Sequence, residues 1–266
     1  MAFELIDIGA NIAHDSFDDD FDDTLQRAKA AGVTRIIVTG SSDESNIAAA
    51  RLATDYQGTL YSTAGVHPHH ASDYSDASDA TIRKLVKEPH VVAVGECGLD
   101  YFRNFSPRDA QLDAFRRQLE IAKAVQKPLF LHQRDAHDDF VDVLEPYLPD
   151  ISRAVAHCFT GTGESLGEYL KMGLYIGITG WICDERRGKH LYDIVSIIPD
   201  NRLLVETDAP YLLPRTLRPK PKTRRNEPMY LPEVVRIIAE ARGQSTDHVA
   251  RVSTENAMRF FALPDA

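Results

Sequence analysis

The sequence predicts a (β/α)8 barrel, a fold in which eight parallel strands alternate with helices and the active site lies at the carboxyl ends of the strands. Short apolar runs alternate with longer amphipathic stretches along the whole chain. The positions that follow these runs recur at intervals from 23 residues (157 to 180) to 36 residues (96 to 132), the length of one strand and one helix. Six of the eight positions carry a polar residue; in order they are Asn11, Gly40, His67, Glu96, His132, His157, Gly180 and Asp208.

The first half of the chain supplies the first four strands. Residues 5–8 form the first, and the acidic run DDDFDD at 18–23 places negative charge at the start of a helix that continues to about residue 31. Strands are expected at 35–39 and 60–66, and helices at 45–56 and 79–88. The run VVAV begins a buried fourth strand at 91–95, where Gly95 and Gly98 bracket Glu96 and allow backbone or ligand to approach closely.

The second half continues the same alternation. We expect strands at 128–131, 153–156, 174–178 and 203–205, and helices at 107–125, 136–148, 164–172, 189–197, 231–241 and 246–261. Because no flexible linker interrupts this pattern, residues 1–266 are expected to form a single domain. A doubly wound open sheet is the alternative, but no G-x-G-x-x-G motif follows the first strand.

Composition excludes several classes of protein. No apolar run approaches the roughly 20 residues that a membrane span needs, so we expect no membrane segment. The N-terminal MAFELIDIG leads straight into a strand without the features of a signal peptide, so a cytoplasmic enzyme is expected, and we expect it to be a monomer. Cys97, Cys158 and Cys183 cannot all pair, which argues against a disulfide framework.

The charge is unevenly distributed. The formal net charge of −10 argues against nucleic-acid binding by the whole surface. Residues 214–228, PRTLRPKPKTRRNEP, carry six basic residues and one acidic residue, so this segment has a charge of +5 within a chain whose remainder is −15. Such a local patch is expected where a polyanionic substrate approaches one place, although a solvated, proline-stiffened loop is the alternative.

Four of the strand-end residues have the chemistry of metal ligands. Glu96, His132, His157 and Asp208 each follow an apolar run, and the carboxyl ends of barrel strands meet at one face. Carboxylate oxygens and imidazole nitrogens together form a divalent-metal site. The residues alone therefore predict a metal-dependent hydrolase.

Several longer motifs occur together in this order: GVHPH at 65–69, GECGLDY at 95–101, LHQRDA at 131–136, HCFTG at 157–161, YIGITGW at 175–181, ETDAPYL at 206–212 and RRNEP at 224–228. With these motifs the chain resembles the TatD family of metal-dependent deoxyribonucleases over nearly its whole length. The resemblance implies a barrel of the amidohydrolase type and magnesium-dependent removal of nucleotides from the 3′ end of single-stranded DNA, with RNA as a second candidate substrate. A role in DNA repair or nucleic-acid turnover is expected at the level of the family.

The resemblance also implies roles for individual residues. Glu96, His132, His157 and Asp208 would hold the metal, Asp208 would contact it or serve as general base, and Glu206 would support the site as a neighbouring acceptor. Clamps on the phosphate oxygens and rings that stack on a base are expected among His67, His69, Arg134, Arg225, Asn226, Tyr101 and Trp181. Core packing is the alternative for Phe102 and for Trp181.

One motif departs from the family pattern. Many members carry Asp-x-His-x-His at the end of the first strand, where this chain has Asp7, Ile8, Gly9, Ala10 and Asn11. Because both histidines are missing, we expect one firmly held ion near Glu96, His132 and His157 and a second that is weak or absent. Mg²⁺ is the expected cation, with Mn²⁺ or Zn²⁺ as alternatives.

Two other functions are weighed against the nuclease. An amidohydrolase acting on a small cyclic amide or ester would explain the barrel and the metal, but it would leave the basic segment unexplained. A noncatalytic binding protein would explain the missing histidines. It would not explain why Glu96, His132, His157, Glu206 and Asp208 are all present.

Overall fold

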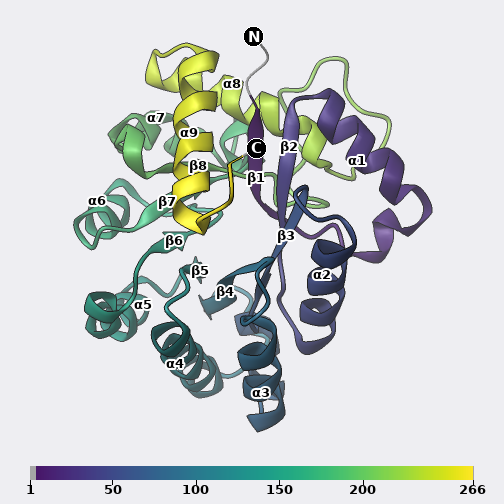
Figure 1. Cartoon of the computed structure of the whole chain (residues 1–266). Helices are drawn as coiled ribbons and strands as arrows, with labels where there is room; N and C mark the ends of the chain where they lie inside the picture. The colour runs from purple at the N-terminus through teal and green to yellow at the C-terminus, as the bar shows by residue number, and fades with distance from the viewer. Residues whose placement is uncertain (1–3, 266) are drawn as a thin grey trace. The chain divides into compact units, whose positions relative to one another are not determined.

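A computed structural model describes residues 4–265 of the 266-residue chain, and its eight strands form one sheet in the order β1 to β8 (Figure 1). At least one α-helix follows each strand, which is the element order of a (β/α)8 barrel, so the predicted fold class is confirmed. The strands are β1 Leu5–Ala10, β2 Val33–Val38, β3 Leu60–Ala64, β4 Val91–Asp100, β5 Leu129–Arg134, β6 Ala154–Ala156, β7 Tyr175–Ile178 and β8 Leu203–Val205. The helices are α1 Phe21–Ala30, α2 Asp43–Asp55, α3 Asp76–Leu85, α4 Arg108–Val125, α5 His137–Leu144, α6 Gly163–Lys171, α7 Lys189–Ile194, α8 Leu231–Arg242 and α9 Thr246–Phe261.

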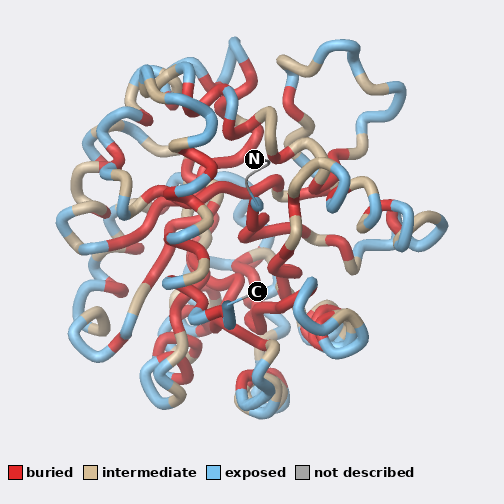
Figure 2. The backbone as a smooth tube through the Cα atoms, turned by 45° about the horizontal axis from the view of Figure 1, so that its top comes forward, coloured by how far each residue is buried: buried red, intermediate tan, exposed pale blue. Residues whose placement is uncertain are grey.

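The chain divides into two compact units. The central unit comprises Val38–His157 and Lys171–Tyr175, and the terminal unit comprises the chain up to Ile37, Cys158–Leu170 and the chain from Ile176. In both units the buried residues run along the strands, while the loops and outer helix turns are exposed (Figure 2). None of the helices in the described part of the chain is both long and apolar enough to cross a bilayer.

In the central unit, β3, β4, β5 and β6 pair in parallel with their neighbours. Strand β4 is longer than the sequence predicts, because it continues past Gly95 to Asp100. Its register with β5 shifts between Val94 and Cys97. The two glycines make this possible: a Cβ on Gly95 would lie 2.1 Å from the carbonyl oxygen of Phe130, and one on Gly98 would lie 1.9 Å from that of His132. Glu96 therefore lies inside the strand and not after it.

In the terminal unit, β7 and β8 pair in parallel, and α9 packs against β1 and β8. The basic segment is joined to the start of α1 by a network of ion pairs. Arg225 contacts Asp20 at 2.7 Å and Glu227 at 2.9 Å, and Arg27 contacts the same two carboxylates at 2.7 and 2.8 Å. This network fixes the last residues of the basic segment.

Most predicted helices agree with the structure to within a few residues, and α9 agrees at both ends. The predicted helix at 136–148 is an exception, because α5 ends at Leu144 and a 3₁₀ helix, Glu145–Asp150, follows. Pro146 lacks the backbone N–H that would continue the α-helical pattern. The helix expected at 189–197 likewise ends at Ile194 and continues as a short 3₁₀ helix.

Candidate metal centre

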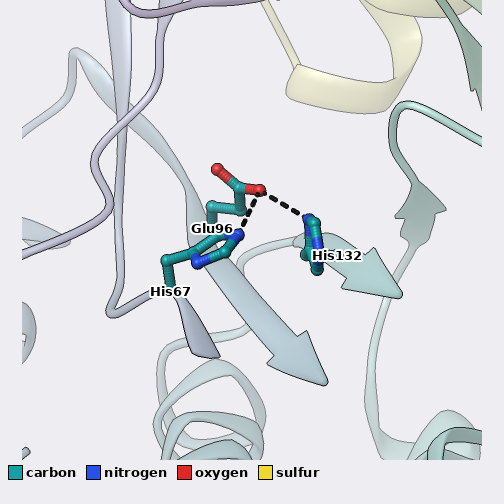
Figure 3. A group of neighbouring side chains, drawn as sticks. All are labelled: His67, Glu96 and His132. Atoms are coloured by element: carbon teal, nitrogen blue, oxygen red, sulfur yellow. Dashed lines mark hydrogen bonds and ion pairs between the residues drawn. The ribbon is translucent and has the colours of Figure 1, made fainter. Parts of the chain in front are cut away.

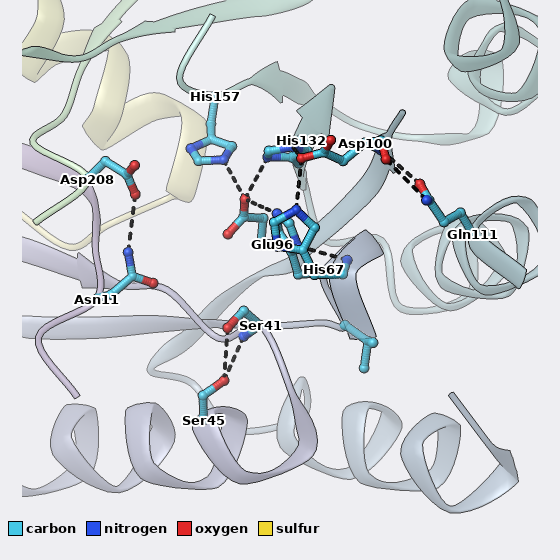
Figure 4. A network of polar contacts seen from close by, with 12 residues as sticks. Asn11, Ser41, Ser45, His67, Glu96, Asp100, Gln111, His132, His157 and Asp208 are labelled. Atoms are coloured by element: carbon cyan, nitrogen blue, oxygen red, sulfur yellow. Dashed lines mark hydrogen bonds and ion pairs between the residues drawn. The ribbon is translucent and has the colours of Figure 1, made fainter. Parts of the chain in front are cut away.

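Three imidazole rings converge on one carboxylate oxygen in the central unit. Glu96 Oε1 lies 3.0 Å from His132 Nδ1 and 3.3 Å from His67 Nε2 (Figure 3). His157 Nε2 lies 2.7 Å from the same oxygen (Figure 4). Glu96, His67 and His157 are buried, and His132 is partly exposed. The structure thus brings together three of the predicted ligands, Glu96, His132 and His157, and adds His67 to the group.

His67 is placed by two buried amide side chains that bind the backbone just before it. Asn46 donates to the carbonyl of Gly65 at 2.9 Å and accepts from its N–H at 3.0 Å. Gln118 makes the equivalent pair of hydrogen bonds to Val66, at 2.7 and 3.0 Å. Because each buried amide holds both the N–H and the carbonyl of one residue, the backbone just after β3 has little freedom to move.

The other residues are placed by the sheet itself. Backbone pairing of β4 with β5 sets Gly98 beside His132, and the N–H of His157 donates to the carbonyl of Leu131 at 2.9 Å. The N–H of Glu96 donates to the carbonyl of Gly40 at 2.7 Å. The cluster is therefore carried by backbone hydrogen bonds along the strand ends.

A second carboxylate, Asp100, lies behind the cluster and was not singled out from the sequence. Asp100 is buried, and its Oδ2 lies 2.9 Å from His69 Nε2 and 3.2 Å from His132 Nε2. Gln111 accepts from the N–H of Asp100 at 2.8 Å and donates to its carbonyl at 3.1 Å (Figure 4). The signal in the sequence is positional: Glu96, Gly98 and Asp100 alternate on one face of β4, which becomes visible only once the strand is known to reach residue 100.

The hydrogen bonds assign different roles to the histidines. His132 has a carboxylate at each ring nitrogen; donation from Nε2 to Asp100 would leave the Nδ1 lone pair available to a cation bound beside Glu96. His67 differs, because its Nδ1 accepts the N–H of His69 at 3.0 Å, so the ring proton of the neutral imidazole lies on Nε2. His132 is thus suited to bind a cation, and His67 to donate a hydrogen bond.

The pKa directions follow from burial and from the neighbouring groups. Burial lowers the pKa of His132, but its hydrogen bonds to Asp100 and Glu96 outweigh burial and the net pKa is raised. Burial lowers the pKa of His67 well below its ordinary value, so the ring is neutral. Burial also raises the pKa of Glu96, but the neighbouring histidines outweigh it and the net pKa lies well below the usual range. For Asp100, hydrogen bonds from His132 and His69 likewise overcome burial and lower the pKa. Both acids are therefore carboxylates at neutral pH.

The donor set fits a divalent cation. Ligand atoms of His67, Glu96 and His132 lie within 4.8 Å of one another, and a carboxylate with imidazole nitrogens is a common set for divalent metals. Distance alone admits His67 as a ligand, whereas its tautomer favours a donor role. The tautomer is the stronger criterion, since a nitrogen that carries a proton has no lone pair to offer.

Asp208 and Glu206 follow β8 in the terminal unit. Asp208 Oδ1 accepts a hydrogen bond from Asn11 Nδ2 at 3.1 Å, and the Asp208 backbone has a positive φ of 55° (Figure 4). Glu206 is buried, and its Oε1 accepts the N–H of Cys158 at 2.5 Å. Asn11 therefore orients Asp208, and Glu206 holds the residue that follows His157 in the chain.

Among the predicted substrate contacts, four side chains lie close to another side chain of the protein. His69 contacts Asp100, the Tyr101 hydroxyl donates to Asp139 at 2.6 Å, and the guanidinium of Arg134 lies 3.9 Å from the centre of the Phe102 ring. Trp181, in the terminal unit, lies under the guanidinium of Arg187 at 4.5 Å.

Arg225 and Asn226 are held within the protein. Arg225 belongs to the ion-pair network with Asp20 and Glu227. Asn226 is fully buried; its Nδ2 donates to the carbonyl of Thr207 at 2.9 Å and its Oδ1 accepts the N–H of Glu227. The structure gives these two residues an anchoring role, which the sequence, read as a basic motif, did not indicate.

Comparison with known proteins adds to this geometry. A family model described as "TatD related DNase" matches residues 6–262. A protein of Erwinia billingiae named 3′-5′ ssDNA/RNA exonuclease TatD is 50% identical over 260 residues, covering 98% of this chain and all of the relative. A protein of Musicola paradisiaca with the same name is also 50% identical, over 259 residues, covering 97% of this chain and 98% of that relative.

Solved structures agree with the sequence relatives. The TatD homologue YJJV of Escherichia coli superposes with a TM-score of 0.90 at 31% identity, covering 99% of this chain and 100% of that one. A hydrolase TatD family protein of Entamoeba histolytica superposes with a TM-score of 0.89 at 28% identity and the same coverage. An uncharacterized amidohydrolase of Saccharomyces cerevisiae, 22% identical with a TM-score of 0.86 and covering 97% of this chain and 100% of that one, shows the shared fold alone.

Proposed function

Because this chain belongs to the TatD-related DNase family, we propose that it is a divalent-metal-dependent 3′-5′ exonuclease acting on single-stranded DNA and RNA. The observation that carries the proposal is the convergence of His67, His132 and His157 on one oxygen of Glu96. The names of the relatives supply the substrate class and the direction of cleavage.

Glu96, His132 and His157 would hold the cation. His132 would use Nδ1, with its other nitrogen donated to Asp100, and His157 would use Nε2. A bound divalent cation would polarise the phosphoryl group and lower the pKa of a water molecule. His67, with its proton on Nε2, would donate a hydrogen bond to a nonbridging phosphate oxygen, which is the clamp expected from its position after β3.

Asp208 and Glu206, which follow β8 in the terminal unit, are proposed to have further roles in the reaction. Asp208 would act as general base or as a further ligand, oriented by Asn11. Glu206 would support the site through the backbone of Cys158. These two roles rest on the family resemblance and on the place of both residues after a strand, where barrel enzymes carry their catalytic groups.

We propose Mg²⁺ as the working cation, with Mn²⁺ and Zn²⁺ as alternatives to be compared. The resemblance favours Mg²⁺, whereas the imidazole nitrogens around Glu96 favour Zn²⁺. One firm site is proposed, since Gly9 and Asn11 replace the histidines of the strand-one pattern. Finding two tightly bound zinc ions per chain would contradict this part of the proposal.

The proposal also covers the compartment, the state of assembly and the biological role. We propose a cytoplasmic monomer, and the three free cysteines are consistent with a reducing compartment. We also propose a role in DNA repair or nucleic-acid turnover, because the substrate class is nucleic acid. Light scattering at several protein concentrations measures the state of assembly.

The experiment is digestion of single-stranded oligonucleotides labelled at the 3′ or the 5′ end, with each cation or with chelator. We expect stepwise loss of nucleotides from the 3′ end that requires the cation and is abolished by Glu96→Ala with His132→Ala. The matched control is His70→Ala, an exposed histidine in the same segment as His67. Absence of cleavage with every divalent cation would contradict the proposal and favour a small-molecule hydrolase.

A further inference from the structure

The loop after β4 presents two phenylalanines to solvent. Phe102 is 54% exposed and Phe105 is 67% exposed, and they are the only phenylalanines exposed among residues 4–265. A single exposed apolar residue needs no explanation. Two exposed phenylalanines in one loop of seven residues do need an explanation, because neither ring is buried in the core. We call residues 101–107 the aromatic loop.

The aromatic loop is held in place although its rings are exposed. The Ser106 hydroxyl donates to the carbonyl of His69 and accepts the N–H of Ser72, both at 3.0 Å. Gln111 donates to the carbonyl of Ser106 at 2.8 Å, and the N–H of Arg103 donates to Asp100 at 2.7 Å. A loop tied down at both ends presents its rings with little loss of conformational freedom on binding.

Phe105 lies next to the candidate metal centre. Its ring contacts that of His69, with centroids 4.7 Å apart and planes at 62°. The His69 ring lies 4.2 Å from that of His67, which reaches Glu96. Only the ring of His69 therefore lies between Phe105 and His67, the residue proposed to donate to the scissile phosphate.

The charges around the aromatic loop suit a polyanion. Arg134 lies over the ring of Phe102 at 3.9 Å, Arg103 lies 5.8 Å from it, and Arg108 lies over Tyr101 at 4.1 Å. The acids nearby are the buried Asp100, the Tyr101 partner Asp139, and the exposed Asp109 and Asp135. Aromatic rings interleaved with guanidinium groups are the surface that binds single strands, since every base has a face on which a ring can stack.

We infer that Phe105 and Phe102 stack on bases of the single-stranded substrate, with Phe105 on the nucleotide nearer the cleaved bond and Arg134 on the backbone beyond it. This inference rests on the proposed function and deepens it. It gives the enzyme a means to hold a strand without reading its sequence, because stacking tolerates every base. It also excludes duplex ends as good substrates, since their bases are already stacked on one another.

Binding is measured apart from cleavage, in chelator, by the fluorescence anisotropy of a 5′-fluorescein oligothymidylate. We expect Phe105→Ala to raise Kd about tenfold, and Phe105→Trp to keep it within about twofold, since a larger ring still stacks. An oligonucleotide with abasic residues at its 3′ end should bind wild type and Phe105→Ala alike. Ile47→Ala, which removes another exposed apolar side chain of the central unit, is the matched control.

In digestion with the cation present, Phe105→Ala should raise KM and leave kcat nearly unchanged, because the ring acts on binding. An unchanged Kd and KM in Phe105→Ala, with wild type still degrading the strand, would overturn the stacking inference and leave the nuclease proposal intact. A wild type that neither binds nor degrades single strands would instead overturn the nuclease proposal. A change in the state of assembly without a change in Kd would show that the two rings bind a second copy of the chain, which also overturns the inference.

Discussion

His132 is held between two carboxylates, with Nδ1 at Glu96 and Nε2 at Asp100. We predict that Asp100→Asn weakens cation binding about 10- to 100-fold, because loss of the partner frees the ring to turn and lowers its basicity. Isothermal calorimetry with Mn²⁺ or Zn²⁺ measures the affinity directly. The rise in melting temperature on adding the cation should shrink in parallel.

Asp109→Asn provides the control for this prediction. Asp109 is an exposed acid at the start of α4 and accepts a hydrogen bond from Ala110, so its replacement removes the same charge without touching a histidine. The control should bind the cation as wild type does. If Asp100→Asn also keeps its affinity, the orienting role of Asp100 is wrong.

Asp7 carries a second prediction at this scale. Burial raises its pKa to about 7, although hydrogen bonds from Thr207 and Gly9 oppose the rise. A buried acid whose folded pKa lies above its unfolded value of 3.8 binds its proton more tightly when folded, so the stability of the protein falls as pH rises from about 4 to about 7 and is then level.

Asp7→Asn removes this dependence because the amide does not titrate. The free energy of unfolding of the variant, relative to that of wild type, should therefore rise by about 2 to 3 kcal/mol between pH 5 and pH 8. Urea unfolding of both proteins at the two pH values measures the gap. An equal gap at pH 5 and pH 8 would show that Asp7 does not titrate in this range.

At the scale of elements, the approach of β5 to β4 depends on glycine. A Cβ at residue 98 would lie 1.9 Å from the carbonyl oxygen of His132, and the φ of Gly98 is 142°. We predict that Gly98→Ala costs about 3 kcal/mol or more of stability, since β5 has to move away. The displacement of His132 should also remove the cation-dependent rise in melting temperature.

Gly173→Ala separates the steric clash of a Cβ from the strain of a positive φ. Gly173 has a φ of 82°, and a Cβ there would have no heavy atom within 4 Å, so only the backbone conformation is strained. This control should cost about 1 to 2 kcal/mol and leave cation binding unchanged. A Gly98→Ala protein as stable as Gly173→Ala would contradict the steric argument.

The same strand shows how far sequence patterns reach. Eight short apolar runs, 23 to 36 residues apart, predicted the element order, and the residues predicted to follow them included Glu96, His132 and His157. Apolar patterning could not reveal that β4 continues through GECGLD to Asp100, because its last residues bury polar groups against histidines from other elements. Asp100 and Gln111 acquire their roles only from those distant partners, which no local pattern records.

At the scale of the whole molecule, a chain of net charge −10 concentrates basic residues in one segment. Arg225 is committed to Asp20 and Glu227, whereas Lys220, Lys222 and Arg224 are exposed. We predict that replacing these three by alanine weakens binding of single strands and lowers the slope of log Kd against log salt by about 2, the value for three phosphate contacts.

The control replaces Arg51, Lys84 and Lys87, which are exposed on α2 and near the end of α3, and it changes the net charge equally. Its salt slope should equal that of wild type. If both triple variants lower the slope alike, the substrate responds to net charge and not to the basic segment.

The division of the chain into two units has a consequence for its synthesis. The histidines and Glu96 of the candidate metal centre all lie between residues 67 and 157, within the continuous stretch of the central unit. At a typical rate of translation, Asp208, which is 51 residues (208 − 157) beyond His157, leaves the ribosome roughly 3 to 10 s later. A nascent chain therefore carries Glu96, His132 and His157 before it carries Asp208.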